Sequence, residues 1–424
     1  REMRAMVYYE LKKIFCKGAN KAAILLLCAT VFIFAVMAVY SAYYVDEAGN
    51  EHKGPGACHA LAALQEQWEG PLTEAKIREV LQENVRINAM PQALSEDVTQ
   101  QNIAYSLKQG FSDIRNLINY SYDSFNSYDY YKIDSVGPEE AGKFYANRLR
   151  NLKQYLEGDG SYYFTDKEKA FLISQYEQME APLIYEPHIG WAKMIEYFPG
   201  ICSLLALVVA FVCAGIFSGE FSTKADAVFF SALYGRNRAV SAKIKAGCLI
   251  ITLLYWVCIA AYVLLVLLLA GWGGSGTMIQ TDTSGWKSFY NITFLEQALW
   301  CFVGGYVGCL VIGALTMVIS AKTKSTILAA VIPFILIFSP EIFSSLTVYP
   351  FFETLFTAAP GKLLQINELI EGFSMYTVGG RYLALFISSF HYMRLFFVFS
   401  CQYSTGFIKG SVSSPLGGTA AVCK

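Results

Sequence analysis

The fold of this chain is decided by residues 247–271, which read GCLIITLLYWVCIAAYVLLVLLLAG and contain no charged side chain. The hydrocarbon core of a bilayer is about 30 Å thick and is crossed by about 20 consecutive apolar residues in a helix. Lipid offers no partners for backbone amides and carbonyls, so such a segment must be helical. The stretch therefore predicts a membrane-spanning helix.

Five further apolar runs share this character, and together they predict an all-α polytopic membrane protein with six transmembrane helices. The last two runs are less regular, because Pro333 and Pro340 interrupt the fifth and His391 and Arg394 lie inside the sixth. The predicted spans are Ala22–Tyr43, Phe198–Phe217, Ala246–Ala270, Leu299–Ile319, Thr326–Leu346 and Tyr382–Cys401.

The composition agrees with a membrane protein. Only 16% of the 424 residues are charged, whereas a soluble domain carries about 25%. The charges are segregated along the chain rather than absent, so the net charge of -1 gives no indication of a nucleic-acid partner. Most of the eleven cysteines lie in or beside apolar runs, where we expect them to act as small packing residues. These are Cys28, Cys202, Cys213, Cys248, Cys258, Cys301, Cys309 and Cys401.

The short loops predict how the chain is oriented. Lys and Arg in short loops mark the cytoplasmic side, and here they gather before the first span, between the second and third, and between the fourth and fifth. The first run lacks a small-residue cleavage pattern, so we expect it to be retained as an anchor. This predicts a multi-pass protein of the cell membrane with both termini in the cytoplasm and the large polar stretch outside.

Residues 44–197 form that polar stretch, for which we predict a mainly helical extracellular domain inserted between the first two spans. Apolar residues at three- and four-residue spacing predict the buried faces of two helices. One face comprises Leu72, Ile77, Val80, Leu81 and Ile87, and the other comprises Phe144, Tyr145, Leu149, Leu152 and Leu156.

Two local features of this domain carry further predictions. Thr165 and Glu168 have the spacing of a capping box, which satisfies the free amides of a first helical turn. Residues 119–135 read NYSYDSFNSYDYYKIDS. This stretch is either a platform for a peptide, sugar or lipid head group, or a loop whose rings pack on the helices while their hydroxyls reach water. The second interpretation is favoured.

Sequence motifs for chemistry are missing from the chain. It has no G-x-x-x-x-G-K-[ST] phosphate-binding loop, no H-E-x-x-H and no paired C-x-x-C. His52, Cys58 and His59 lie close in sequence but lack a fourth ligand, so we predict neither a metal site nor a cofactor. We expect the chain not to be an enzyme, and not to be its own P-loop ATPase.

Three segments carry a resemblance to a known family. Residues 217–247 read FSGEFSTKADAVFFSALYGRNRAVSAKIKAG, with Glu220 at the membrane exit, a short amphipathic stretch, a turn and a basic lead into the third span. Residues 6–27 read MVYYELKKIFCKGANKAAILLL, and residues 183–200 read LIYEPHIGWAKMIEYFPG. These segments resemble, in turn, the cytosolic loop, the amphipathic interfacial helix (here 1–21) and the lead into the second span of ABC-2-type permeases, the membrane subunits of many bacterial ABC exporters.

The resemblance implies a role for residues 218–245 as a cytosolic coupling loop that a separate ABC ATPase pushes. In it, Phe229, Phe230 and Leu233 would fill a groove on the ATPase, while Glu220 would accept hydrogen bonds from the interfacial helix or from the ATPase. The alternative is an ordinary basic loop that only sets topology. The predicted coupling residues are Glu220, Asp226, Phe229, Phe230, Leu233, Tyr234, Gly235, Arg236 and Arg238.

The resemblance also implies pairing with a second permease, as a homodimer or heterodimer, and short helices dipping into the membrane within residues 347–381. Gly304 and Gly308 have the small-xxx-small spacing that lets helices approach closely, between two chains or within one. The chain departs from the family in its sixth span, which carries Arg394, and in the tail 402–424.

The sequence is compatible with three functions. The favoured one is the permease half of an ABC exporter that moves a peptide, drug or lipid-like compound. The second is a non-transporting sensor or secretion-complex component that binds a ligand through its extracellular domain. A membrane-embedded enzyme is the least favoured, because no intramembrane carboxylate pair or His cluster is present in the sequence.

Overall fold

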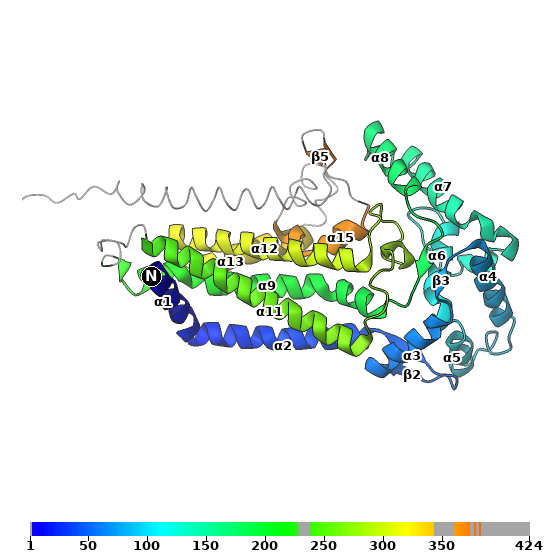
Figure 1. The fold of residues 1–424 in the computed structure, drawn as a ribbon, viewed down its shortest axis with the longest axis horizontal. Helices are drawn as coiled ribbons and strands as arrows, with labels where there is room; N and C mark the ends of the chain where they lie inside the picture. Colours follow the sequence, from blue (N-terminus) through cyan, green and yellow to red (C-terminus); the bar gives the residue numbers. More distant parts are fainter. Residues whose placement is uncertain are drawn as a thin grey trace, which may run out of the picture.

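The computed structural model describes residues 2–226, 228, 238–342, 360–373, 377–378 and 381–382. A bundle of long helices occupies one part of the molecule, and a domain of shorter helices covers one end of the bundle (Figure 1). The bundle consists of α1 (Glu2–Cys16), α2 (Gly18–Ser41), α9 (Ile189–Ser222), α11 (Val240–Ala270), α12 (Phe294–Thr323) and α13 (Thr326–Ile342).

Four of these helices, α2, α9, α11 and α12, are long and apolar enough to cross a membrane. The protein therefore has the helices of a multi-pass membrane protein. The fifth predicted span corresponds to the shorter helix α13, whose apolar part is Thr326–Ser339. The sixth predicted span and the tail 402–424 lie outside the described residues.

The helices extend beyond the apolar runs that predicted them. The second span was predicted from Phe198, whereas α9 begins at Ile189 and includes Pro199. The third was predicted from Ala246, whereas α11 begins at Val240 and includes Lys243. Apolar runs mark the part of a helix that lipid can cover, and polar helical turns continue past it where the protein supplies partners.

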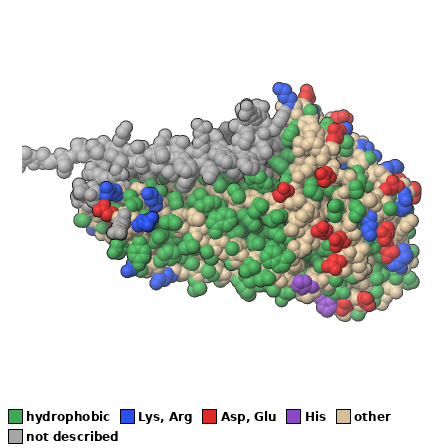
Figure 2. All heavy atoms as spheres, in the orientation of Figure 1, with side chains coloured by type: hydrophobic (Ala, Val, Ile, Leu, Met, Phe, Trp, Pro, Cys, Tyr) green, Lys and Arg blue, Asp and Glu red, His purple; other side chains and the backbone are tan. Residues whose placement is uncertain are grey.

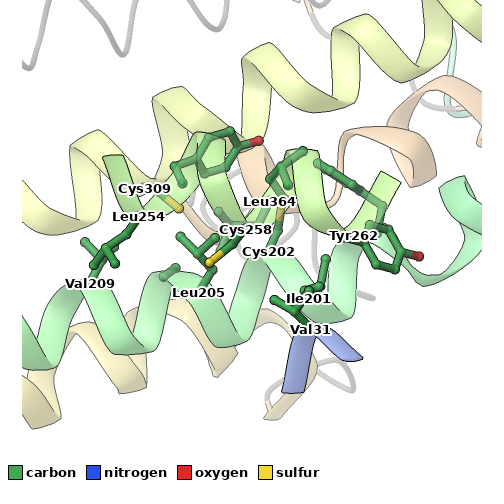
Figure 3. Packing of buried hydrophobic residues seen from close by; sticks show 14 of the residues in the cluster. Val31, Ile201, Cys202, Leu205, Val209, Leu254, Cys258, Tyr262, Cys309 and Leu364 are labelled. Carbon is green, nitrogen blue, oxygen red and sulfur yellow. The ribbon is translucent and has the colours of Figure 1, made fainter. Parts of the chain in front are cut away.

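The center of the bundle is formed by α9, which packs against α2, α11, α12 and α13. Its buried residues meet small and aromatic side chains of the neighbouring helices (Figure 3). Transmembrane helices associate through close packing rather than through the hydrophobic effect, because lipid is as apolar as a leucine side chain. The residues in view are Val31, Ile201, Cys202, Leu205, Val209, Leu254, Cys258, Tyr262, Cys309 and Leu364.

Cysteines contribute to this packing as predicted at Cys202, Cys213, Cys258, Cys301 and Cys309, which are all buried. The prediction is wrong for Cys28, which is exposed on α2. It lies on the face of α2 that turns away from the bundle, as do Leu25 and Phe32. Cys248 is half-buried, and Cys401 lies outside the described residues.

The domain at the end of the bundle, here called the insertion domain, runs from residue 42 to residue 188. Three antiparallel strand pairs occur in the described chain, β1 (Tyr43–Val45) with β2 (Glu51–Lys53), β3 (Gly70–Pro71) with β4 (Ile184–Tyr185), and β5 (Thr377–Val378) with β6 (Arg381–Tyr382). The helices of the insertion domain are α3 (Pro55–Glu66), α4 (Glu74–Asn88), α5 (Val98–Ser106), α6 (Ser112–Tyr122), α7 (Phe144–Glu157) and α8 (Asp166–Glu177).

The predicted helix faces of this domain are confirmed. All five residues of the first set are buried, although Leu72 precedes α4 rather than lying on it; of the second set, Phe144, Leu152 and Leu156 are buried and Tyr145 and Leu149 are partly buried. Thr165 and Glu168 form the predicted capping box at the start of α8. In the tyrosine-rich stretch, the rings of Tyr120 and Tyr122 pack on the core of the domain, as the favoured interpretation predicts, but the Tyr122 hydroxyl donates to the Glu140 carbonyl at 2.5 Å and Tyr131 is exposed. The alternative of a binding platform stays a prediction.

A polar loop, residues 271–293, connects α11 to α12 and docks on the insertion domain. The guanidinium of Arg148, which is buried, donates to the carbonyls of Trp286 at 3.1 Å and Ser288 at 3.0 Å and lies 3.8 Å from the ring of Tyr176. The loop ends at a second capping box, formed by Thr293 and Glu296 at the start of α12. The remaining short elements are three-residue to six-residue helical turns, η1 (Gln109–Phe111), η2 (Lys132–Ser135), η3 (Pro138–Lys143), η5 (Ile279–Thr281), η7 (Pro360–Leu364) and α15 (Ile366–Glu371).

Candidate functional site

The predicted coupling loop joins α9 to α11 at the end of the bundle opposite the insertion domain, where α1 also lies (Figure 1). Figure 2 shows Lys and Arg side chains at this end, a hydrophobic band over the bundle, and Asp and Glu side chains over the insertion domain. The end of the bundle that carries α1 is called the α1 end below.

A buried ion-pair cluster lies at the base of this loop. Glu220, in the last turn of α9, accepts from Lys243 of α11 at 2.8 Å and also pairs with Lys13 of α1. The ammonium of Lys243 is fully buried and also donates to Glu10 of α1 at 2.9 Å and to the carbonyl of Ile216 at 3.0 Å. An ammonium has three N–H donors, so three acceptors satisfy it.

The cluster connects three helices that are far apart in sequence. A fully buried charge is tolerated only when it is paired and hydrogen-bonded, and removing one partner leaves a charge without compensation. Glu10 and Lys13, three residues apart on α1, supply one charge of each sign to the other two helices. The last turn of α9, the first turn of α11 and α1 are therefore fixed to one another.

Weaker contacts surround the cluster. Arg238, just before α11, pairs with Glu2 of α1 at 2.7 Å, and both side chains are largely exposed. Such surface pairs contribute about 0–1 kcal/mol. Lys17, between α1 and α2, donates to the carbonyl of Gly215 at 3.2 Å. Burial lowers the pKa of Lys17, and the charges of Lys13 and Lys243 lower it further.

Hydroxyl groups connect α9 to the turn between α12 and α13. Ser320 donates to the carbonyl of Ala214 at 2.5 Å and accepts from the amide of Ser218 at 2.9 Å. The hydroxyls of Ser218 and Thr326 lie 2.7 Å apart. The α1 end thus joins the starts or ends of α1, α9, α11, α12 and α13 by polar contacts.

The structure places only part of the predicted coupling set. Glu220 lies in the cluster, where its observed partners are Lys13 of α1 and Lys243 of α11. Arg238 contacts the same helix, and Asp226 is partly exposed just beyond the end of α9. Phe229, Phe230, Leu233, Tyr234, Gly235 and Arg236 lie outside the described residues.

The two predicted packing glycines approach a short segment rather than another long helix. A Cβ atom on Gly304 would lie 1.8 Å from Cδ1 of Ile366, and one on Gly308 would lie 2.8 Å from Cδ2 of Leu364. Both neighbours belong to η7 and α15 of the same chain. Close approach between long helices occurs instead at Gly305, whose added Cβ would lie 2.6 Å from the Tyr255 hydroxyl.

Sequence reasoning missed Lys243, Glu10 and Lys13 as members of the cluster. Lys243 was assigned to a cytosolic loop because it precedes the apolar run, but it belongs to the first turn of α11. A signal was present: Glu10 and Lys13 are opposite charges three residues apart on a predicted amphipathic helix, and Glu220 and Lys243 flank one loop.

Comparison with known proteins identifies no relative of this chain. No protein-family model, no curated protein and no solved structure shows significant similarity to this chain.

Proposed function

We propose that this chain is the membrane permease subunit of an ABC-2-type ABC transporter and exports an amphipathic compound of peptide, drug or lipid-like type. ATP is hydrolysed by a separate ABC ATPase, and the chain itself is not catalytic. The observation that carries the proposal is the cluster at the base of the coupling loop, in which the fully buried Lys243 pairs with Glu220 and Glu10 while the half-exposed Lys13 pairs with Glu220.

The cluster supports coupling for a mechanical reason. A cytosolic subunit that pushes on residues 223–239 applies force to the end of α9 and the start of α11, the two helices that flank them. Because α1 is tied to α11 by the pair of Glu10 with the buried Lys243 and to α9 by the pair of Lys13 with Glu220, all three helices move as one body. A loop that only set topology would need basic residues there, but it would not need a fully buried lysine.

The proposed orientation places the α1 end in the cytoplasm and the insertion domain outside the cell membrane. Lys12, Lys13, Lys17, Lys322 and Lys324 all belong to segments at the α1 end, as the distribution of basic residues on the cytoplasmic side requires. Two such permeases, identical or paralogous, would pair and recruit two ATPase subunits.

Co-purification with the products of neighbouring genes tests the proposal. The chain should retain a stoichiometric subunit of nucleotide-binding size in mild detergent, and the double substitution Arg236→Glu with Arg238→Glu should release it. Recovery of the folded chain without such a subunit would overturn the proposal and favour the sensor.

A matched variant separates ATPase binding from the contact with α1. Arg238→Glu alone breaks the pair with Glu2, and adding Glu2→Arg restores an ion pair of opposite polarity. If Arg238 contacts the ATPase, the restored pair will not bring the subunit back. Full recovery of the subunit in the double variant would show that Arg238 acts only through α1.

A further inference from the structure

A cavity of about 520 Å³ lies where the insertion domain meets the bundle, and it is called the junction cavity below. Its wall is built from the end of α2, α3, α6, the start of α9, the loop 271–293, the start of α12 and α15. Small-molecule sites in proteins have volumes of about 300–1,000 Å³ and often form where two structural units meet. The junction cavity has the size and the place of such a site.

The wall of the cavity carries more negative than positive groups. Its carboxylates are Asp113, Glu196, Asp282 and Glu371, and its cationic groups are Lys193 and His188. Lys193 pairs with Glu196 at 2.8 Å, and His188 lies 3.4 Å from Asp282. Within the described residues, neither Asp113 nor Glu371 forms an ion pair.

These two carboxylates are held by neutral donors. Asp113 accepts from Gln65 and from the Tyr185 hydroxyl, each at 2.9 Å, and Glu371 accepts from Gln297 at 2.7 Å. Each of these bonds uses one oxygen of its carboxylate. A carboxylate has about four lone-pair sites, so both groups keep acceptor capacity toward the cavity.

Two further acceptors on the wall have no hydrogen-bond partner among the residues that the structure describes. Gln65 is 2% exposed and Asn367 is 5% exposed, and the side-chain oxygen of each is buried without a hydrogen bond. The amide orientation of Gln65 is fixed chemically, because a carboxylate such as Asp113 can only accept and the NH₂ group must face it. A buried acceptor without a partner has lost its hydrogen bonds to water without replacement, and a ligand with N–H donors would supply them.

Lys193 keeps N–H donors on this wall, but the capacity left by the two unpaired carboxylates and the two amide oxygens is that of hydrogen-bond acceptors. The complementary ligand group carries positive charge and several N–H donors, and it has no acceptor that would require a donor from the protein. Ammonium and guanidinium groups have three and five donors and no acceptor. Among the residues that the structure places, no group of three or more His, Cys, Asp or Glu side chains is arranged to hold a metal ion.

The rest of the lining suits an organic body attached to that group. Leu61, Ile189, Ile195, Ile279 and Phe294 contribute apolar surface to the same cavity. We propose that the junction cavity binds the primary ammonium or guanidinium group of an organic cation through Asp113, Glu371, Gln65 and Asn367. The inference does not rest on the proposed function, since it concerns the opposite end of the bundle.

The ionisation of Glu371 gives the site a pH dependence. Burial, opposed by the hydrogen bond from Gln297 and aided by the charges of Asp282, Glu368 and Glu196, raises the pKa of Glu371 to about 7. A bound cation stabilises the ionised form, so the cation and the proton compete. Affinity rises about tenfold between pH 6 and pH 8 because the ionised fraction of a group with a pKa near 7 rises by that factor.

The remaining titratable groups act in the same direction. Burial raises the pKa of Asp113 despite the charge of His188. Burial lowers the pKa of His188, but the hydrogen bond and charge of Asp282, with the charge of Asp113, outweigh it and leave that pKa raised. A rise in pH favours the ionised form of Asp113 and the neutral form of His188, and both changes favour a cation.

The test uses the full chain in nanodiscs of zwitterionic lipid, with agmatine as the probe and calorimetry as the readout. Agmatine carries both a guanidinium and a primary ammonium group. Choline is the control ligand, because it carries one positive charge, against two on agmatine, and no N–H donor. We expect agmatine to bind, choline to bind at least tenfold more weakly, and the agmatine affinity to rise between pH 6 and pH 8.

Two variants and a control assign the site. Glu371→Gln should weaken agmatine binding about tenfold to hundredfold, the range for losing one charged hydrogen bond. Glu368→Gln, on the same short helix but paired with Lys362 at 3.3 Å, should leave the affinity within twofold. Asn367→Leu should weaken binding without lowering the stability of the fold, because it removes an acceptor that has no partner.

Three results would overturn the inference. One is the absence of agmatine binding up to millimolar concentration, and another is equal affinity for agmatine and choline. The third is wild-type affinity in both Glu371→Gln and Asn367→Leu. If Glu371→Gln fails to fold, Asn367→Leu alone decides the assignment.

Discussion

Replacing Lys243 by methionine should destabilise the folded chain by roughly 3–5 kcal/mol, the cost of breaking a buried ion pair by removing one partner. The Lys243 side chain is fully buried, and its ammonium lies 2.8 Å from Glu220 and 2.9 Å from Glu10. Without it, two carboxylates that are 10% and 19% exposed face each other beside Lys13, which is largely accessible to water. Unfolding by SDS in mixed micelles, followed by circular dichroism, measures the loss.

Lys245→Met is the matched control, because Lys245 is exposed two residues further along the same helix. It removes the same charge from the same side of the membrane, so any effect on insertion is shared. We expect this variant to stay within about 0.5 kcal/mol of the wild type.

A compensated variant makes the reasoning refutable. Adding Glu10→Gln and Glu220→Gln to Lys243→Met removes the uncompensated charges, and the triple variant should recover much of the lost stability. Effects within one network are not additive, so recovery identifies the ion pairs as the cause. If the triple variant is less stable than Lys243→Met alone, or if Lys243→Met matches Lys245→Met, the cluster does not hold these helices together.

Two further predictions concern the bundle and its junction with the insertion domain. Gly305→Ala should lower the free energy of unfolding by about 1–3 kcal/mol, because its Cβ would lie 2.6 Å from the rigidly held Tyr255 hydroxyl. Gly308→Ala should lower it less in the same SDS titration, because its Cβ would meet the end of a flexible leucine side chain at 2.8 Å. His188 and Asp282 stabilise each other's charges against burial, which leaves the pKa of His188 raised and that of Asp282 lowered to about 2. The unfolded pKa values of Asp and His are about 4 and about 6.5, so the pair contributes fully to the free energy of unfolding between these pH values. This contribution is lost as the pH rises through the folded pKa of His188. The SDS midpoint should fall from pH 6 to pH 9, and it should fall less in His188→Gln.

The parts of the fold that could be predicted from the sequence are those governed by local pattern. The uncharged stretch 247–271 predicted the greater part of α11, and helical spacing predicted the buried face of α4. Thr165 and Glu168 predicted a capping box because the whole motif lies within four residues. In each case the interacting groups are close in sequence, so the local sequence pattern is sufficient to predict the structure.

The charged cluster and the junction cavity could not be predicted in this way. Lys243 meets Glu10, which is 233 residues away, so no local pattern distinguishes it from an ordinary basic residue beside a membrane. The cavity gathers Gln65, Asp113, Glu371 and Asn367 from three separate parts of the chain. Only the packed structure shows that all three N–H donors of Lys243 have acceptors, and that the amide oxygens of Gln65 and Asn367 have no donor among the described residues.

That difference assigns distinct roles to the two ends of the bundle. At the α1 end every donor of the buried ammonium has an acceptor, which is the property of a rigid joint. At the junction, buried acceptors remain without donors, which is the property of a site that awaits a ligand. Both sites involve α9, because Glu220 lies in its last turn and His188 lies immediately before its first residue.

The geometry of α9 therefore gives a physical route between the two ends. Its 34 residues span about 50 Å at 1.5 Å per residue. If an ATPase at the α1 end shifts α9, it changes the wall of the junction cavity and hence the affinity for a bound cation. Linkage is reciprocal for binding free energies, so the cation would change the affinity for the ATPase by the same factor. Under the proposed function, a rigid joint at one end of this central helix and a ligand cavity at the other would let the protein exchange free energy between the ATPase and the cation.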